Sequence, residues 1–128
     1  SKDNRDQTLE GVEKTLLKRL QRALDVDQIW KREGLSIGKL AHELSIPEYR
    51  LRRLINERLG YKNFADFINS HRIKVAKAAL SDPAQATLSI SQLAFDLGYG
   101  SLGPFNRAFK ASTDLSPTQW RTQKLADS

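Results

Sequence analysis

The chain has no cysteine and only two histidines, so it offers few of the side chains that ligate metals or act as nucleophiles. Without cysteine it can form neither a disulfide nor a cysteine-ligated zinc site. His42 and His71 have no partner at metal-binding spacing and lie in no nucleophile motif. We therefore expect no metal, no cofactor and no catalytic site, and we do not expect an enzyme.

Long apolar runs are missing as well. Hydrophobic residues make up 39% of the 128 residues, yet no run approaches the roughly 18 apolar residues that a membrane-spanning helix needs. We therefore expect no membrane partner. Methionine is absent even at position 1, so we expect a piece of a longer protein with a further domain before it.

Acidic residues are the scarcer charged class, with 15 Asp and Glu against 21 Lys and Arg. The net charge is +6 and the pI is near 9.8. A pI above about 9 favours a polyanionic partner such as nucleic acid, although many small basic domains bind none. Whether the chain binds a polyanion or is simply a basic domain therefore depends on which structural motif carries the basic residues.

A helix-turn-helix pattern is present in residues 88–110. Ser89 with Gln92 is a capping-box pattern that starts a helix, and Gly98 suits the left-handed residue that ends it. The apolar face of this helix consists of Ile90, Leu93, Ala94 and Leu97. The apolar face of the next helix consists of Phe105, Ala108 and Phe109. Two short helices joined by a glycine-bearing turn are typical of a helix-turn-helix.

The same pattern occurs earlier, in residues 35–56, with an offset of 53 before the turn and 54 after it. The matched pairs are Leu35 with Leu88, Ser36 with Ser89, Ile37 with Ile90, Leu40 with Leu93, Ala41 with Ala94, Leu44 with Leu97, Leu51 with Phe105, Arg53 with Arg107 and Ile55 with Phe109. An internal repeat is a strong organising signal. The sequence therefore predicts an all-α fold with two helix-turn-helix motifs, the first at 36–60 and the second at 89–112.

Helical patterns precede both motifs. After the polar residues 1–7, an apolar stripe predicts a helix from Thr8 to Leu24; it consists of Leu9, Val12, Leu16, Leu20 and Leu24. Either this stripe packs onto the domain, or residues 1–24 form a tail and a linker or dimerisation helix. Asp25 with Gln28 predicts a further short helix that carries Trp30 into the core and stops at Gly34.

Two more helices are expected, one between the motifs and one after them. Residues 63–81 form a long linker helix that ends before a proline. Ser116 and Pro117 with Gln119 combine an N-cap, a proline at the first helical position and a capping box. A short last helix therefore begins there, and we expect Trp120 in the core.

The second helix of the first motif begins at Pro47 and lies in the densest basic patch, with five basic and two acidic residues between Ile46 and Lys62. Helical rotation turns Leu51, Leu54 and Ile55 inward, exposes Tyr49, Arg53 and Asn56, and leaves Arg50 and Arg52 on the flanks. One interpretation is a solvated face with the i,i+4 pairs Glu48–Arg52 and Arg53–Glu57. The position on the second helix of a helix-turn-helix favours contact with nucleic acid instead.

From about Asp25 to Arg121 the chain resembles the DNA-binding domain of AraC/XylS-type transcription regulators. The resemblance is carried by LAHELSIPEYRLRRLINERLG, HRIKVAKAAL and ISQLAFDLGYGSLGPFNRAFKASTDLSPTQWR. It implies about seven helices within residues 25–128, in two helix-turn-helix subdomains joined by one long helix, here with an extra N-terminal helix. It also implies a bacterial regulator in the cytoplasm, at the nucleoid, that binds double-stranded promoter DNA.

The resemblance implies partners and contacts too. RNA polymerase is a further expected partner; we expect the isolated domain to be a monomer and the full-length protein a dimer. Because both motifs lie in one chain, one monomer should cover successive major grooves, about 34 Å apart, on a non-palindromic site. Base contacts are expected from Tyr49, Arg52, Arg53, Leu102, Gly103, Asn106 and Arg107. Backbone contacts are expected from Arg50, Asn56, Lys62, Ser101 and Lys110.

The second recognition helix departs from the family's commoner pattern. Leu102, Gly103 and Pro104 offer no side-chain hydrogen bond at the start of this helix, where polar residues are usual. Base reading by the second motif is therefore expected to depend on Asn106 and Arg107. Pro104 itself is compatible with a first helical turn, where no intrahelical donor is needed.

Other function classes fit the sequence less well than DNA binding. GYGSLG, at 98–103, satisfies G-x-G-x-x-G, but a dinucleotide site needs a strand before it and an acid about 20 residues after it. The preceding SISQLAFDL is helical in pattern, and Asp114 is too near. A helical protein-interaction module would use the basic patch on an acidic protein surface. The domain would also suit a DNA-modifying protein that needs a targeting module.

Overall fold

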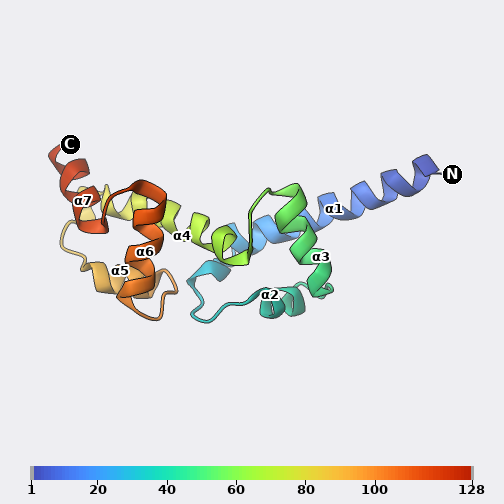
Figure 1. The fold of residues 1–128 in the computed structure, drawn as a ribbon, viewed down its shortest axis with the longest axis horizontal. Helices are drawn as coiled ribbons and strands as arrows, with labels where there is room; N and C mark the ends of the chain where they lie inside the picture. The colour runs from blue at the N-terminus through green and yellow to red at the C-terminus, as the bar shows by residue number, and fades with distance from the viewer. Residues whose placement is uncertain (1, 128) are drawn as a thin grey trace. The chain divides into compact units, whose positions relative to one another are not determined.

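The structure, a computed structural model, describes the backbone of residues 2–127 and the side chains of residues 10–127. These residues form seven α-helices and no strand (Figure 1). The helices are α1 Lys2–Asp25, α2 Ile37–Glu43, α3 Glu48–Arg53, α4 Phe64–Leu80, α5 Ile90–Asp96, α6 Leu102–Thr113 and α7 Pro117–Ala126. Within this part of the chain, no helix combines the length and the apolar character that a membrane crossing requires. The all-α prediction is confirmed.

The chain divides into two compact units, each with a core of its own. The first unit comprises Ser1–Ile29 and Leu35–Phe64, and it contains the first helix-turn-helix, α2 and α3. The second unit comprises Trp30–Gly34 and Ala65–Ser128, and it contains the second, α5 and α6. The two motifs predicted from the repeat therefore lie in different units.

Helix α1 is longer than predicted, since it begins at Lys2 rather than Thr8. From Leu16 onward its apolar stripe is buried in the first unit, where Leu20 is 1% exposed. Val12 is 38% exposed, so its predicted place on a packed stripe is wrong. Leu9 lies outside the residues whose side chains are described. The packing of the stripe favours the interpretation that α1 belongs to the domain core.

The short helix predicted between Asp25 and Gly34 is wrong. Asp25 is the last residue of α1, and its carboxylate accepts a hydrogen bond from Gln21 Nε2 at 2.7 Å instead of capping a new helix. Gln28 has a φ of +51°, which breaks the helix, and only a 3₁₀ turn follows at Ile29–Lys31. Trp30 is 4% exposed, so its core position is confirmed.

The first helix-turn-helix is stabilised at both ends of α2. Ser36 is the N-cap, and its hydroxyl accepts a hydrogen bond from the backbone N–H of Lys39 at 3.1 Å. At the other end, the Arg19 guanidinium of α1 donates to the carbonyl oxygen of Leu44, a helix C-terminal group that would otherwise lack an intrahelical partner. Pro47 is the N-cap of α3, one residue before the predicted helical position. Helix α1 therefore supports the turn that leads into α3.

The second helix-turn-helix begins as predicted at Ser89, whose hydroxyl accepts from the backbone N–H of Gln92 at 3.0 Å. The reciprocal half of the capping box is wrong, because the Gln92 side chain donates to Asp96 at 2.8 Å instead. Gly98 has a φ of +92°, which confirms the left-handed residue after α5. A charged acceptor four residues on makes a stronger hydrogen bond than the neutral N-cap arrangement, so the capping pattern is only half formed.

Aromatic rings form the core that carries α6 and α7. The ring centroids of Tyr99 and Phe105 lie 5.4 Å apart, those of Phe105 and Phe109 5.8 Å, and those of Phe109 and Trp120 5.8 Å. Both phenylalanines are fully buried. Trp120 is only half-buried, at the edge of this core, and its Nε1 donates to the Ser81 hydroxyl. The predicted start of α7 is confirmed, because its capping box is complete.

Candidate nucleic-acid interface

Helix α3 separates an apolar face from a polar one as its sequence predicts. Leu51, Leu54 and Ile55 are between 0 and 3% exposed and pack into the first unit. The opposite face is exposed and consists of Tyr49, Arg50, Arg52, Arg53 and Asn56. Tyr49 is 67% exposed, so its ring and hydroxyl are accessible on this face. Every candidate contact residue of the first motif is therefore accessible, and Lys62 is exposed as well.

A π-helical turn, Leu54–Arg58, continues α3. π-Helical turns are rare in proteins, and those that occur often lie at functional sites. At its end Arg58 Nε donates to Glu13 Oε2 of α1 at 3.0 Å. This ion pair links the end of the π-helical turn to α1. Together with the bond from Arg19 to Leu44, it holds α3 and the turn before it against α1.

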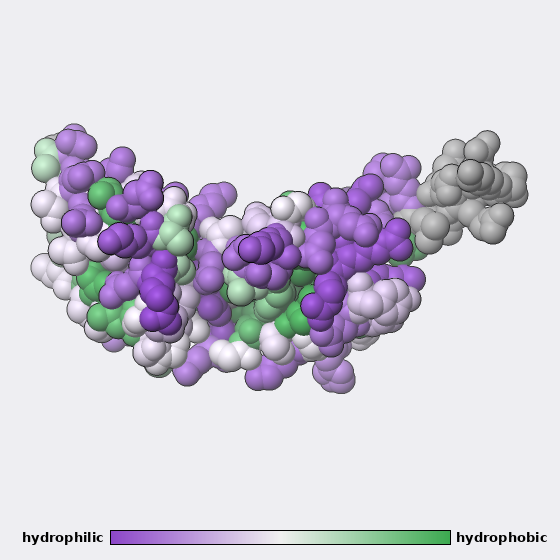
Figure 2. Space-filling model, in the orientation of Figure 1, coloured by the Kyte–Doolittle hydropathy of each residue, from purple (hydrophilic) through white to green (hydrophobic). Residues whose placement is uncertain are grey.

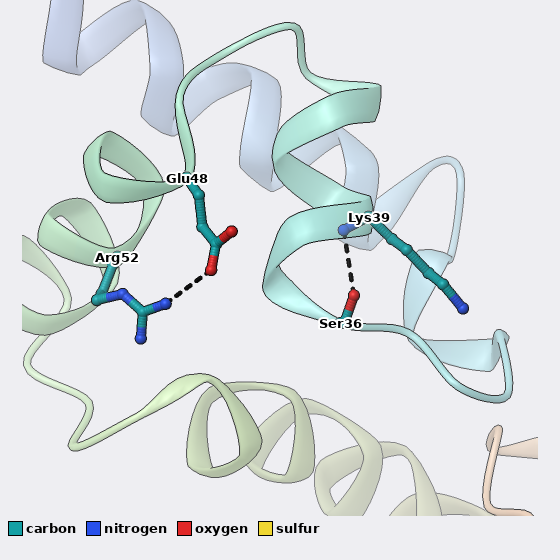
Figure 3. A network of polar contacts seen from close by, with 4 residues as sticks. All are labelled: Ser36, Lys39, Glu48 and Arg52. Atoms are coloured by element: carbon teal, nitrogen blue, oxygen red, sulfur yellow. Dashed lines mark hydrogen bonds and ion pairs between the residues drawn. The ribbon is translucent and has the colours of Figure 1, made fainter.

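Two ion pairs lie along the exposed face of α3, as the spacing predicts. Arg52 Nη2 donates to Glu48 Oε1 at 2.7 Å, and Figure 3 shows this pair beside the Ser36 cap of α2. Arg53 Nε donates to Glu57 Oε2 at 3.0 Å. All four side chains are more than half exposed. Among the described residues Arg50 has no acidic partner, so it remains available for a phosphate.

Helix α6 presents a different surface. Ser101 is its N-cap but makes no side-chain capping bond, so its hydroxyl is not used by the helix. Leu102 is 37% exposed, and Asn106, Arg107 and Lys110 are exposed. A Cβ added to Gly103 would lie 3.3 Å from Arg107 Nη1, so the guanidinium lies close over the bare glycine. The polar groups of this helix begin only at Asn106.

Pro104 lies at the third helical position of α6, within the first turn, as expected. The residues before GYGSLG form α5, a helix, so the strand that a dinucleotide site requires is not there. Figure 2 shows hydrophilic residues over most of the visible face, with smaller apolar areas between them. The exposed apolar side chains include Tyr49 on α3 and Leu102 on α6.

Sequence reasoning missed the polar network behind the second motif. Arg72 of α4 is 9% exposed, and its guanidinium donates to the carbonyl oxygens of Trp30 at 2.7 Å and Arg32 at 3.1 Å. Its charge lies 4.9 Å from the Tyr99 ring, and the Tyr99 hydroxyl donates to Asn69 Oδ1 at 2.6 Å. Burial lowers the pKa of Arg72 and raises that of Tyr99. The 42-residue separation of Arg72 and Trp30 left no signal in the sequence.

Comparison with known proteins identifies the family. A profile described as a helix-turn-helix domain matches residues 40–123, about two thirds of the chain. Uncharacterized HTH-type transcriptional regulators from Staphylococcus aureus strains MSSA476 and N315 are 29% identical over 108 residues, 84% of this chain. The chain spans 14% of the length of these curated relatives.

Solved structures agree with the profile. The C-terminal domain of AraT, a response regulator from Geobacillus stearothermophilus, has a TM-score of 0.67 at 26% identity, over 75% of this chain and 76% of that one. The C-terminal domain of the two-component response regulator yesN from Fusobacterium nucleatum shows the same fold, with a TM-score of 0.68 at 19% identity over 84% of this chain and 96% of that one. The chain belongs to the AraC-type helix-turn-helix family, the DNA-binding domains of transcription regulators.

Proposed function

We propose that this chain binds double-stranded promoter DNA sequence-specifically, with α3 and α6 each in a major groove, and thereby regulates bacterial transcription. The observation that carries the proposal is the exposed face of α3, where Tyr49, Arg50, Arg52 and Arg53 lie together above a fully buried apolar face. A recognition helix reads base edges with such a face, and arginine matches the two acceptors of guanine.

The roles of individual residues form part of this proposal. Bases are read by Tyr49, Arg52, Arg53, Leu102, Gly103, Asn106 and Arg107. The DNA backbone is contacted by Arg50, Asn56, Lys62, Ser101 and Lys110. The first motif dominates base preference, because α6 offers no polar side chain between Leu102 and Phe105. The site is therefore non-palindromic and unequal, with its strongest preferences under α3.

The wider setting is also proposed. The isolated domain binds as a monomer, since both motifs belong to one chain, and the full-length protein acts as a dimer that contacts RNA polymerase. The relatives it resembles are bacterial regulators, which supports a place at the nucleoid in the cytoplasm. No group of three or more His, Asp or Glu side chains that could hold a metal ion is found among the described residues.

The test is selection of bound duplexes from a random pool, followed by fluorescence anisotropy with the selected site. Arg53→Ala should weaken binding to that site about 5- to 150-fold, because one bidentate contact to guanine is worth about 1–3 kcal/mol. It should also relax preference at one base pair. Arg50→Ala is the matched control on the same helix and should weaken binding to all sequences about equally, with a lower salt dependence.

Equal affinity of the parent chain for selected and scrambled duplexes would overturn sequence-specific binding. Unchanged preference in Arg53→Ala would remove that residue from the reading face. Circular dichroism of each variant checks that the helical fold is kept, as we expect because both side chains are exposed.

A further inference from the structure

Glycine at position 103 leaves open the space beside the Arg107 guanidinium on α6. The two residues lie one helical turn apart, and the side chains of a helix lean toward its N-terminus, so residue 107 reaches back over residue 103. A Cβ added at Gly103 would lie 3.3 Å from Arg107 Nη1. An ordinary non-bonded contact has about 3.5–4.0 Å between its atoms. Any side chain at position 103 would therefore push the guanidinium away from its present place.

The Arg107 guanidinium is not held by a polar partner of its own. Among the described residues Arg107 makes neither a hydrogen bond nor an ion pair, and its side chain is exposed. Its N–H donors are therefore all available to a base. No side chain from Leu102 to Phe105 is polar. The guanidinium thus supplies a polar group level with Gly103, where the side chains of the first turn supply none.

The internal repeat shows how the first motif differs at the same positions. With the offset of 54, Tyr49 corresponds to Gly103 and Arg53 corresponds to Arg107. One turn after the first arginine, Glu57 accepts from Arg53 Nε at 3.0 Å, whereas the second motif has no acid at the corresponding position. The first arginine is therefore held by a carboxylate. The second has open space beside the residue one turn before it.

We propose that Gly103 determines the specificity of the second motif by leaving the Arg107 guanidinium the space from which it reads its base. The inference rests on the proposed function, in which Arg107 contacts a base edge. Gly103 acts here through the arginine and is a positioning residue. A bidentate contact requires two donors to meet O6 and N7 of guanine at hydrogen-bond distance, so a displaced fork loses part of that contact.

A second mechanism would be direct: a bare glycine lets DNA approach the helix backbone closely. An added methyl group would then collide with the DNA itself, and its effect would not depend on the arginine. If the glycine acts through the guanidinium, the effect disappears once the arginine has been removed. A double-mutant cycle distinguishes the two mechanisms, because it isolates the coupling between two residues.

The experiment compares the intact chain with Gly103→Ala, Gly103→Val, Arg107→Ala and the double variant Gly103→Ala/Arg107→Ala. Competition anisotropy measures each protein against the selected duplex and against duplexes with one base pair replaced. Arg107→Ala identifies the base pair that the arginine reads. Gly38→Ala on α2 is the matched control, because its Cβ would make only an ordinary contact, 3.5 Å from Glu48 Oε2. Circular dichroism and urea unfolding check the fold of every variant.

We expect Arg107→Ala to lower discrimination at its base pair about 5- to 150-fold, the range for one bidentate contact to guanine. Gly103→Ala should lower it about twofold or more, as part of one such contact, and Gly103→Val should lower it further because its side chain fills more of the space. In the Arg107→Ala background, Gly103→Ala should change nothing further. The urea midpoint of Gly103→Ala should not fall, because alanine is a better helix former than glycine. Gly38→Ala should leave discrimination at this base pair unchanged.

Equal losses from Gly103→Ala with and without the arginine would show a direct collision with DNA, and the inference would be wrong. Full discrimination at the Arg107 base pair in both Gly103→Ala and Gly103→Val would also overturn it. Neither result would affect the proposed function. If Arg107→Ala left every base preference unchanged, Arg107 would not read a base, and its role in the proposed function would fail together with the inference.

Discussion

Replacement of Gly98 by alanine should severely destabilise the second unit. Gly98 has a φ of +92°, and a Cβ there would lie 2.6 Å from the Trp30 carbonyl oxygen, 2.8 Å from Arg72 Nη2 and 2.9 Å from the Lys31 carbonyl carbon. Two of these three atoms belong to the backbone, so they cannot move aside by rotating a side chain. Arg72 is itself fixed by two carbonyl oxygens.

The magnitude follows from three terms. A left-handed backbone costs a non-glycine residue about 1–2 kcal/mol, and overpacking a close contact costs about 1–3 kcal/mol. Alanine also lowers the conformational entropy of the unfolded chain, which stabilises the folded protein by about 0.4–1 kcal/mol. Gly98→Ala should therefore lower the free energy of unfolding by about 1–4.5 kcal/mol, a substantial share of the roughly 5–15 kcal/mol of a typical domain.

Two glycines provide matched controls. Gly60 has a φ of +76°, but a Cβ there would meet nothing within 4 Å. Gly60→Ala therefore measures the cost of the left-handed backbone alone, and it should lower the free energy of unfolding by about 1 kcal/mol or less. Gly100 is not among the glycines with positive φ, and its Cβ would meet Glu33 Oε1 at 2.8 Å, the far end of a flexible side chain. Gly100→Ala should cost little because that carboxylate can turn away.

Urea unfolding followed by tryptophan fluorescence is the appropriate assay for the second unit, because both tryptophans, Trp30 and Trp120, belong to it. Far-UV circular dichroism reports on both units and allows comparison with Gly60→Ala. If Gly98→Ala lowered the free energy of unfolding no more than Gly60→Ala and Gly100→Ala do, the close contacts with Trp30 and Arg72 would not contribute to the destabilisation, and the reasoning would be refuted.

Two further predictions concern the second unit. Ser116→Ala removes the hydroxyl that accepts from the backbone N–H of Gln119 and leaves the backbone N–H of residue 116 to donate to the Gln119 side chain. It should cost about 1 kcal/mol, measured by urea unfolding, whereas Ser116→Gly should cost less; equal stability of all three proteins would contradict this. Burial raises the pKa of Tyr99 above its unfolded value near 10, so the folded state favours the neutral phenol. Stability from this residue should be complete below pH 10 and should fall as pH rises through the folded pKa. Tyr99→Phe, which keeps the ring beside Arg72 but loses the hydrogen bond to Asn69, should show a shallower alkaline loss in pH-dependent urea midpoints; an identical slope would refute the assignment.

The buried arginine explains why residues 30–34 belong to the second unit although they precede the first motif. Arg72 has no acidic partner among the contacts described for it and is satisfied by the carbonyl oxygens of Trp30 and Arg32. Removing either partner would leave a buried polar group unpaired, which costs more than a neutral hydrogen bond contributes. The segment is thereby fixed beside α4 and Gly98.

The sequence by itself determined the features that depend on neighbours within about four residues. Ser36, Ser89 and Ser116 start helices because each hydroxyl accepts from a backbone N–H three residues ahead. The apolar spacing of Leu51, Leu54 and Ile55 fixed the outward face of α3, because helical geometry places residues three and four apart on one side. The candidate reading face could be predicted for the same reason, while its contacts with DNA stay predictions.

The tertiary structure decided what depends on distant or competing partners. The Gln92 side chain does not close its capping box, and its amide Nε2 donates to Asp96 four residues on. Gln119 has glutamine rather than an acid four residues on, and its Oε1 closes the box by accepting from the Ser116 backbone N–H. The burial of Arg72 and the tight space at Gly98 depend on a segment about 40 to 70 residues away in the chain. Helical periodicity carries no information about such contacts, because they form only when separate elements pack together.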